Sequence, residues 1–270
     1  MLIGFIGLGN MARAIIVGMR GSDSFRNTPI LGSDHNEGKR LEMGERWGVT
    51  ILEDDISVAR QADLLVLAVK PQALPVLFER IVPVRSKPGQ CALSLAAGKP
   101  LSWLAEVLGV EASLIRAMPN VAARVGGSVT ALCANDRATE AQKAMVTDMF
   151  SAVGQAVWMT EERMKAFSTL TGAAPAFTFL YLEALASAGL KAGLPKKMAL
   201  EAAAHMMMGA AKLTLETGEH PASLIDQVTS PGGTTIEGMH TLKALGFEHA
   251  VHEAVKAVME KEQKLQGNGK

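Results

Sequence analysis

The 270-residue sequence predicts an α/β domain followed by an all-helical domain, and two observations carry this prediction. Short apolar runs alternate with helical patterns up to about residue 160, which is typical of a sheet whose strands are connected by helices. After Glu161 no convincing strand pattern remains, and the segments become helical and rich in alanine. We therefore place one domain at residues 1–160 and a second at residues 161–270.

The strand predictions in the first domain rest on short apolar runs. The run Leu64–Val69 does not alternate polar with apolar residues, which favours a central strand buried on both faces. The other predicted strands are Leu2–Ile6, Ile30–Leu31, Ala92–Leu95, Leu114–Ile115, Val129–Cys133 and Ala156–Met159. The predicted helices are Met11–Arg20, Glu37–Arg46, Pro71–Arg80, Leu101–Leu108 and a helix near Glu140–Phe150. This alternation predicts right-handed crossovers and a doubly wound parallel sheet.

The helices predicted for the second domain are separated by proline and glycine. They are Met164–Ala192 with an interruption at Pro175, Pro195–Glu216 stopped by Gly218, His220–Val228, Thr234–Leu245 and Glu248–Leu265. In the second of these helices, small and flexible apolar residues spread over more than one face: Ala199, Ala202, Ala203, Met206, Met207, Ala210 and Ala211. A helix that is apolar nearly all round must be buried on all sides, so we expect this domain to form a dimer.

Composition excludes several classes of protein. Lys plus Arg and Asp plus Glu each number 27, which argues against a general nucleic-acid binder. Cys91 and Cys133 have no Cys-x-x-Cys spacing, so we expect buried reduced thiols and no metal or disulfide. In the first half, Leu64–Val69 is the longest clean apolar run, far short of the roughly 18 residues that span a bilayer. The N-terminus lacks a basic segment, so we expect a soluble, cytoplasmic protein with no membrane partner.

A glycine loop follows the first predicted strand directly and opens a helix. Its pattern is G-x-G-x-x-A, in which Gly7 permits a tight turn, Gly9 lets the backbone approach a pyrophosphate, and Ala12 lets the helix pack closely. The pyrophosphate would lie at the N–H groups of the helix start. An ordinary tight turn is the alternative interpretation. We expect a Rossmann-like dinucleotide site that uses Gly7, Leu8, Gly9, Asn10 and Met11.

The end of the second strand bears on the choice between NADH and NADPH. Asp34 can accept hydrogen bonds from a ribose 2′-hydroxyl, which favours NADH. The neighbouring polar and basic residues can hold a 2′-phosphate, which favours NADPH; they are Ser33, His35, Lys39 and Arg40. The alternative for Lys39 and Arg40 is a solvent-exposed helix face. We expect NADPH to be preferred, with NADH as a second donor.

A further loop, Ala68-Val69-Lys70-Pro71, follows the run that begins at Leu64. In open α/β sheets ligands bind outside the carboxyl ends of the strands, so this loop should face the nicotinamide half of the cofactor. Pro71 suits the first position of the next helix. Lys70 either lines the cleft or points to solvent.

The helical half contains one unusual segment, Thr229–Thr235, in which a proline and two glycines lead into a helix. Such a start leaves N–H groups without partners at the positive end of the helix. Three hydroxyl groups lie close by, on Ser230, Thr234 and Thr235, and a small carboxylate fits this arrangement. The alternative is an N-cap, in which Ser or Thr bonds its own helix start.

Five segments occur in a characteristic order. They are G-F-I-G-x-G-N-M, the A-V-K-P loop, Ile115–Asn120, Glu216–Pro221 and Thr229–Glu237. With them the sequence closely resembles the pyrroline-5-carboxylate reductase family over almost the whole chain, and S-P-G-G-T-T is the most specific part. The resemblance implies a Rossmann-like domain, a helical dimerisation domain and a homodimer that can assemble further. It also implies an imino acid substrate, reduced with hydride from NADPH or NADH to give L-proline, the last step of proline biosynthesis.

The resemblance also implies roles for individual residues. The glycine loop would hold the pyrophosphate, and the residues beside the ribose and the nicotinamide would be Ser33, Asp34, His35, Asp55, Ala68, Val69, Lys70, Pro71, Ala96 and Ala97. The substrate would lie against Ser230, Gly232, Gly233, Thr234 and Thr235. Within that set, the N–H groups of Gly233 and Thr234 would bind the carboxylate. The catalytic residue would be Thr235, whose hydroxyl would hydrogen-bond the ring nitrogen.

The sequence departs from the family pattern near the predicted cleft. The segment Thr171–Phe177 reads T-G-A-A-P-A-F where the family has S-G-S-G-P-A-Y, and Ala173 and Ala174 are among the changed positions. Val121 and Ala122 replace Thr and Pro, and Asp55 stands where an asparagine often contacts the cofactor. Two alternatives therefore stay open: a reductase of a related cyclic imino acid, and a non-catalytic, dinucleotide-sensing relative.

Overall fold

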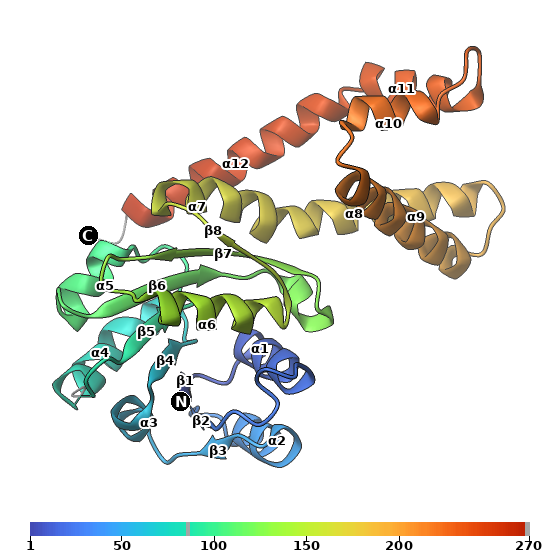
Figure 1. Cartoon of the computed structure of the whole chain (residues 1–270). Coiled ribbons are helices and arrows are strands. Elements are labelled where there is room, and N and C mark those ends of the chain that lie inside the picture. Colours follow the sequence, from blue (N-terminus) through green and yellow to red (C-terminus); the bar gives the residue numbers. More distant parts are fainter. Residues whose placement is uncertain (85–86, 268–270) are drawn as a thin grey trace. The chain divides into compact units, whose positions relative to one another are not determined.

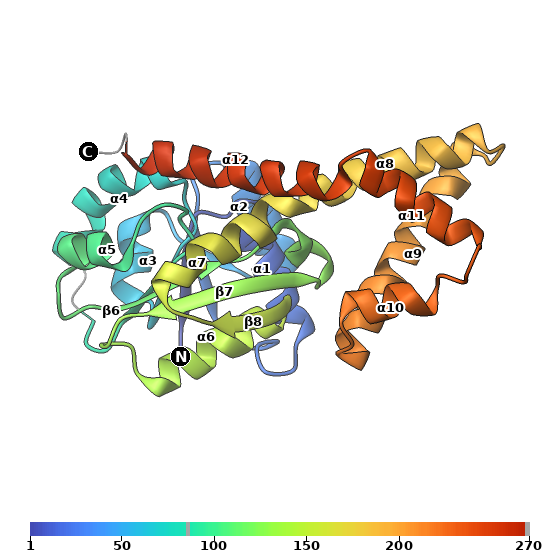
Figure 2. The same cartoon turned by 90° about the horizontal axis from the view of Figure 1, so that it is seen from above.

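The computed structural model describes residues 1–84 and 87–267, and the chain divides into two compact units. The first unit comprises Met1–Gly172 together with Glu262–Lys270, and the second comprises Ala173–Lys261. Figure 1 labels the helices and strands of both units, and Figure 2 shows them from above.

The first unit is built on one sheet whose strand order is β3-β2-β1-β4-β5-β6-β7-β8 in the described part of the chain. The strands are β1 (Ile3–Ile6), β2 (Ile30–Ser33), β3 (Thr50–Ile51), β4 (Leu64–Leu67), β5 (Cys91–Ser94), β6 (Ser113–Met118), β7 (Ser128–Ala134) and β8 (Gly154–Trp158). The register pairs Ile6 with Ser33 on one side and with Leu67 on the other. The loops that follow β1, β2 and β4 therefore leave the same edge of the sheet.

Helices cover both faces of this sheet, as the sequence predicts for a doubly wound fold. They are α1 (Asn10–Gly21), α2 (Glu37–Trp47), α3 (Asp55–Gln61), α4 (Leu74–Ile81), α5 (Leu101–Leu108), α6 (Glu140–Ser151) and α7 (Glu161–Ser168). One core combines α1 and α6 with alternate strand residues such as Phe5 and Val66. The other combines α3, α4 and α5 with Leu65 and Leu67, so β4 is buried on both faces.

The predicted parallel sheet is confirmed except at one pair of strands, β6 and β7. β7 runs antiparallel to β6, and β8 runs parallel to β7. Only residues 119–127 connect β6 to β7, and they hold a short 3₁₀ turn, η3 (Val121–Val125). A parallel crossover needs about a dozen residues or more, so this connection is too short for one.

Several boundaries also differ from the prediction. The sequence analysis missed β3 and α3, because an edge strand of two residues and a helix of seven give little periodicity. The predicted helix at Pro71–Arg80 begins as a 3₁₀ turn, η1 (Pro71–Ala73), and a second turn, η2 (Val82–Val84), follows α4. Both cysteines are buried, as expected, and burial raises the pKa of the Cys133 thiol to about 11.

Arg20, in the last turn of α1, joins three segments of the first unit. Its guanidinium donates to backbone carbonyls of Phe25, Arg26, Thr28, Trp47 and Gly48 at 2.8–3.3 Å. A lysine ammonium is a compact donor and cannot reproduce this planar fork. Burial lowers the pKa of the guanidinium, so these carbonyl bonds must offset a desolvation cost.

We expect Arg20→Lys to lower the free energy of unfolding by about 1–2 kcal/mol, because several carbonyls lose their donor. Urea denaturation checks this value. Arg26→Lys is the matched control, since Arg26 lies in an exposed pair with Asp23 and should change stability by less than about 0.5 kcal/mol. Equal effects of the two substitutions would show that the fork geometry at Arg20 contributes nothing.

The second unit is entirely helical in its described residues. It contains α8 (Ala174–Lys191), α9 (Lys196–Thr217), α10 (Pro221–Gln227), α11 (Thr234–Ala244) and most of α12 (Phe247–Gly267). The predicted interruption at Pro175 takes the form of a π-helical turn, η4 (Thr169–Ala173), directly before α8. α8 and α9 pack closely: a Cβ on Gly189 would lie 2.7 Å from that of Ala199. Gly189 therefore permits this contact.

The second unit has very little core of its own. Its buried apolar residues, among those described, are Ala186, Ala199 and Ala203. Large apolar side chains are exposed on every helix of the unit, including Phe179, Leu180, Met208, Leu215, Ile225, Leu245 and Phe247. This exposed apolar surface indicates burial against another molecule.

The helical run Glu161–Lys191 is long and apolar enough to cross a membrane. A core helix of a soluble protein meets the same test of length and composition, so this is weak evidence for a membrane span.

Candidate functional site

The glycine loop has the geometry that a dinucleotide needs. Gly7 has a φ of +92°, and a Cβ there would lie 2.8 Å from the carbonyl oxygen of Ala68, so only glycine fits. At Gly9 no atom lies within 4 Å of the place that a Cβ would take, which leaves the backbone open to a ligand. The loop thus combines one glycine that the backbone requires with one that leaves room for a ligand.

The start of α1 supplies donors for an anion. Gly9 is its N-cap, has no side chain to cap the helix, and is followed by a first turn without an acidic residue. The N–H groups of this turn and the positive end of the helix dipole face the open side of Gly9. The residues present therefore fit a pyrophosphate, with Asn10 and Met11 at the helix start.

Asp34 joins the glycine loop to the end of β2. Its Oδ2 accepts the N–H of Leu8 at 2.8 Å, and its Oδ1 accepts the N–H of Asn36 at 2.8 Å. The side chain is only 5 % exposed. The N–H of Leu8, predicted to lie at the pyrophosphate, is therefore already used within the protein.

Burial alone would raise the pKa of Asp34, but its environment lowers it below the usual value. The two backbone N–H groups stabilise the carboxylate, and the positive charges of Lys39 and His35 add to this effect. A lowered pKa means that Asp34 contributes stability above about pH 3.9, the pKa of an unfolded Asp. This contribution is lost as the pH falls through the lower, folded pKa.

We expect Asp34→Asn to lower the free energy of unfolding at pH 7 by about 1–2 kcal/mol, because an amide has only one acceptor oxygen for the two N–H groups. The difference from the wild type should shrink below about pH 4. Urea titrations from pH 7 to pH 3 check both points. Asp23→Asn is the control, since Asp23 is 95 % exposed and should change little. A difference that stays constant down to pH 3 would contradict the ionic role.

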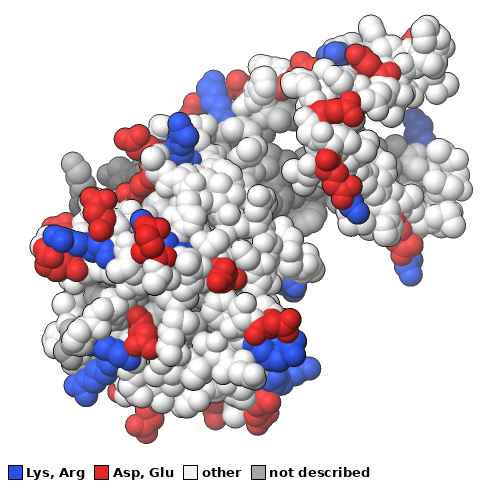
Figure 3. Space-filling view, in the orientation of Figure 1, with Lys and Arg blue, Asp and Glu red and all other residues white. Residues whose placement is uncertain are grey.

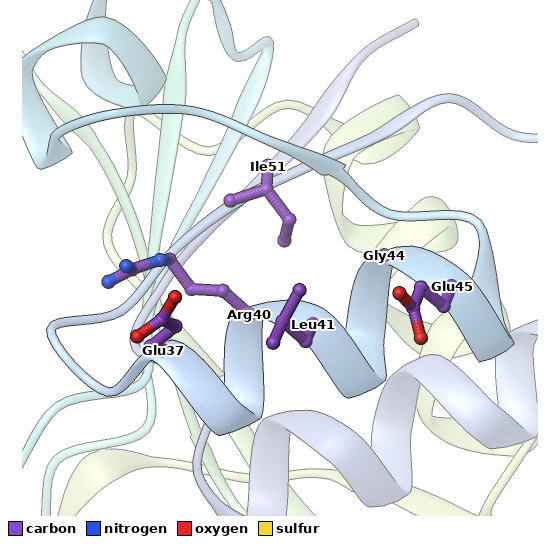
Figure 4. Close-up of a pocket in the computed structure, with 6 residues that line it drawn as sticks. All are labelled: Glu37, Arg40, Leu41, Gly44, Glu45 and Ile51. Atoms are coloured by element: carbon purple, nitrogen blue, oxygen red, sulfur yellow. The ribbon is translucent and has the colours of Figure 1, made fainter.

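A second carboxylate lies beside the end of β2. Asp55, the first residue of α3, accepts the hydroxyl of Ser33 at 2.7 Å and the guanidinium of Arg80 at 3.1 Å. Arg80 comes from α4, and no pattern in the sequence singles it out. A surface pocket between α2 and β3 is lined by Glu37, Arg40, Leu41, Gly44, Glu45 and Ile51 (Figure 4). Of the residues considered for the cofactor, this lining contains Arg40 alone.

The loops after β4 and β5 complete this edge of the sheet. The two strands are neighbours, which places the segment Ala68–Pro71 beside Ala96 and Ala97. Lys70 is exposed and caps the turn η1, and Pro71 is the first residue of that turn, as predicted. The structure thus brings the residues predicted for the cofactor to one edge.

The predicted substrate residues lie in the second unit, on the loop between α10 and α11 and in the first turn of α11. Gly232 has a φ of +67°, and the N–H of Gly233 bonds the carbonyl of Ser230 at 3.0 Å. A Cβ on Gly233 would lie 2.4 Å from the Ser230 hydroxyl oxygen, so this position needs glycine unless the serine moves. Gly233 is also the N-cap of α11. The turn is therefore fixed by glycine and backbone.

The hydroxyls at the start of α11 do not cap their own helix. Thr234 and Thr235 are exposed, and α11 has no side-chain cap bond in the described structure. The N-cap alternative therefore has no support here. Free N–H groups and two free hydroxyls can bind a carboxylate and a second polar group.

Two further segments of the predicted pattern have structural roles. In Glu216–Pro221, Gly218 ends α9 with a φ of +66°, and the His220 side chain caps α10. In Ile115–Asn120, Arg116 is buried in β6 and pairs with Glu161 of α7. The predicted strand Leu114–Ile115 ends before Arg116, so neither the burial of this arginine nor its partner could be identified from the sequence.

The charged side chains give no sign of a large patch of one sign on the face shown in Figure 3, where blue and red groups are interspersed over the first unit. This distribution agrees with the zero formal net charge. A nucleic-acid surface usually shows a basic stripe, and the described residues on the face in Figure 3 show none.

Comparisons with known proteins match almost the whole chain. A family model described as pyrroline-5-carboxylate reductase dimerisation matches residues 161–265, and one described as NADP oxidoreductase coenzyme F420-dependent matches residues 2–98. Pyrroline-5-carboxylate reductase of Escherichia coli is 38 % identical over 97 % of each chain. The same enzyme of Glycine max is 37 % identical over 97 % of this chain and 95 % of its own.

Solved structures agree with these matches. A pyrroline-5-carboxylate reductase from Coxiella burnetii has a TM-score of 0.90 and 32 % identity, covering 97 % of both chains. A pyrroline carboxylate reductase from Plasmodium falciparum, solved with NADP bound, has a TM-score of 0.87 and 25 % identity over 98 % of this chain and 97 % of its own.

Proposed function

The chain belongs to the pyrroline-5-carboxylate reductase family, and we propose that it reduces 1-pyrroline-5-carboxylate to L-proline in proline biosynthesis. NADPH is the hydride donor, with NADH as a second donor. The observation that carries this proposal is the likeness over 97 % of the chain to named reductases. It is supported by a glycine loop that fits a dinucleotide and by a second loop with free N–H and hydroxyl groups.

The chemistry assigns distinct tasks to the two loops. When bound, the nicotinamide supplies a hydride to the imine carbon. The N–H groups of Gly233 and Thr234 hold the substrate carboxylate at the positive end of α11. Ser230 and Gly232 shape the same loop. These groups fix the position of the substrate but do not supply a proton.

Thr235 acts on the ring nitrogen. As the carbon accepts hydride, electron density moves from the carbon–nitrogen double bond to nitrogen, and a hydrogen bond from the hydroxyl stabilises it there. The proton on the nitrogen comes, in this proposal, from solvent or from a substrate that enters already protonated. Thr235 is therefore expected to lower the barrier without changing its own charge.

Steady-state oxidation of NADPH with 1-pyrroline-5-carboxylate tests the proposed function. Turnover with this substrate that exceeds turnover with a six-membered cyclic imino acid would support it. The reverse order would favour the first alternative, for which the changed residues are Val121 and Ala122 in η3 and Ala173 and Ala174 at the start of α8. Binding of NADPH without turnover of either ring would favour a non-catalytic, dinucleotide-sensing protein.

We expect the protein to be a homodimer through its helical unit. The unit buries few apolar side chains of its own, and a match to a dimerisation family covers it. Light scattering at micromolar concentration should give twice the mass of one chain or a multiple of it. A stable monomer under these conditions would contradict the prediction. The resemblance to the reductase family also leads us to infer that dimers associate further. We infer a cytoplasmic location, which is consistent with a small-molecule substrate.

A further inference from the structure

The end of β2 carries an unusual hydrogen-bond arrangement. In a βαβ unit, residues that follow the second strand lie at the adenosine ribose of a bound dinucleotide. Ser33, the last residue of β2, is 2 % exposed and donates its hydroxyl to Asp55 at 2.7 Å. The other oxygen of Asp55 accepts from Arg80 at 3.1 Å. One carboxylate therefore uses a hydroxyl donor and a guanidinium donor at this end of the site.

A hydroxyl and a guanidinium are donors that proteins use to bind a phosphate monoester. A phosphate on the ribose 2′-oxygen would need donors of this kind. Here Asp55 holds both of them, and its own negative charge opposes a second anion nearby. The Asp55 side chain is 22 % exposed, so solvent screens this repulsion only in part.

The other basic residues near this edge also have partners within the protein. Lys39 lies 3.4 Å and His35 3.5 Å from the carboxylate of Asp34. Arg40 donates to the backbone carbonyl of Asp34 at 2.7 Å. A 2′-phosphate would therefore have to compete with these partners for its donors.

We propose that Asp55 is an internal anion at the ribose end of the dinucleotide site, and that it reduces the preference of this chain for a 2′-phosphorylated dinucleotide. This role of Asp55 rests on the proposed function only for the class of cofactor. It predicts that removing the charge of Asp55 removes its repulsion of a 2′-phosphate and weakens its hold on Ser33 and Arg80, whose donors can then turn to the phosphate.

The test uses two fragments of the cofactor, adenosine 2′,5′-bisphosphate and adenosine 5′-monophosphate, titrated calorimetrically into the full chain. In Asp55→Asn the ratio of their affinities should shift about five- to tenfold toward the bisphosphate. The ratio of kcat/KM for NADPH to that for NADH should shift in the same direction. Glu53→Gln is the matched control, since it removes an equal charge from an exposed position two residues away and should shift the ratio less than about twofold.

Arg80→Gln supplies an independent variant on another helix. It leaves Asp55 without its cation, so the affinity ratio should move toward the monophosphate. Combined with Asp55→Asn, it should remove most of the gain. An unchanged ratio in Asp55→Asn, or an equal shift in Glu53→Gln, would overturn the proposal.

If Asp55→Asn does not fold, Arg80→Gln decides: an unchanged ratio then overturns the proposal, and a shift toward the monophosphate supports it. A failure of the proposed reductase function would appear differently. The protein would then bind the nucleotide fragments but would not turn over 1-pyrroline-5-carboxylate with either cofactor.

Discussion

Replacing Thr235 by alanine is expected to lower kcat about ten- to a hundredfold, because one hydrogen bond to a developing charge is worth roughly 1.5–3 kcal/mol. Thr235 is the second residue of α11, is exposed, and is not used as a helix cap in the described structure. Its hydroxyl is therefore available to a ligand. The Kd for NADPH should change much less than kcat, since the cofactor residues lie on the glycine loop and the neighbouring strand ends.

Two other variants show whether the hydroxyl or the fold is responsible. Thr235→Ser keeps the hydroxyl and should retain most of the activity. Thr241→Ala is the matched control on the same helix, because Thr241 is exposed and donates its hydroxyl to the carbonyl of Glu237 at 3.0 Å. Its kcat should stay near that of the wild type.

The competing view is that Thr235 only helps to start α11. In that case Thr235→Ala should cost about 1 kcal/mol of stability and leave turnover nearly intact. The measurement is kcat, the Kd for NADPH and Tm for each variant. A near-wild-type kcat in Thr235→Ala would remove Thr235 from the mechanism. It would leave the carboxylate site in place, because backbone N–H groups at Gly233 and Thr234 survive a change of side chain.

The sequence predicted those features that a local pattern determines. Gly7 and Gly9 could be assigned because a turn with positive φ and an open approach each require glycine at a fixed offset from a strand. The two-domain order and the apolar helices follow in the same way from periodicity. The direction of β7 could also be derived, since residues 119–127 are too few for a crossover, but the strand pattern alone does not show it.

Long-range polar pairs could not be predicted. Asp34 has the residue type and the position expected of a ribose-binding residue. Its carboxylate nevertheless accepts the N–H of Leu8, which lies 26 positions earlier in the chain. Asp55 and Arg80 are 25 positions apart on different helices. No spacing rule connects such residues, because the fold and not the local helix or strand repeat brings them together. The residue types at the site were predictable, but their partners within the protein were not.

The second large effect is expected where the sheet meets α7. Arg116 of β6 is 8 % exposed and donates to Glu161, the first residue of α7. The same Glu161 oxygen accepts the N–H of Leu101 at the start of α5, at 2.8 Å. One carboxylate therefore joins a strand to the starts of two helices. The Nε of Arg116 is buried and has no partner in the described structure. Glu161 is therefore the main group that compensates the positive charge of the Arg116 guanidinium.

We expect Glu161→Ala to lower the free energy of unfolding by about 3 kcal/mol, the lower end for a broken buried pair, because the Glu161 side chain is 31 % exposed. The substitution leaves a buried guanidinium without a counter-ion. Arg116→Met should cost less, under about 1.5 kcal/mol, since it removes that charge, fills similar space and leaves the Leu101 N–H bonded. Denaturant titration of both variants measures the difference.

The comparison of the two stability losses, that of Glu161→Ala and that of Arg116→Met, is the decisive measurement. It separates the cost of an uncompensated charge from the cost of a lost contact. Glu111→Ala is the matched control: Glu111 pairs with Arg137 at 2.8 Å, but the two side chains are 75 % and 54 % exposed. It should change stability by less than about 0.5 kcal/mol. If Arg116→Met proves as costly as Glu161→Ala, the pair acts through its contacts and not through charge. If Glu161→Ala costs no more than Glu111→Ala, solvent already screens the junction at the start of α7.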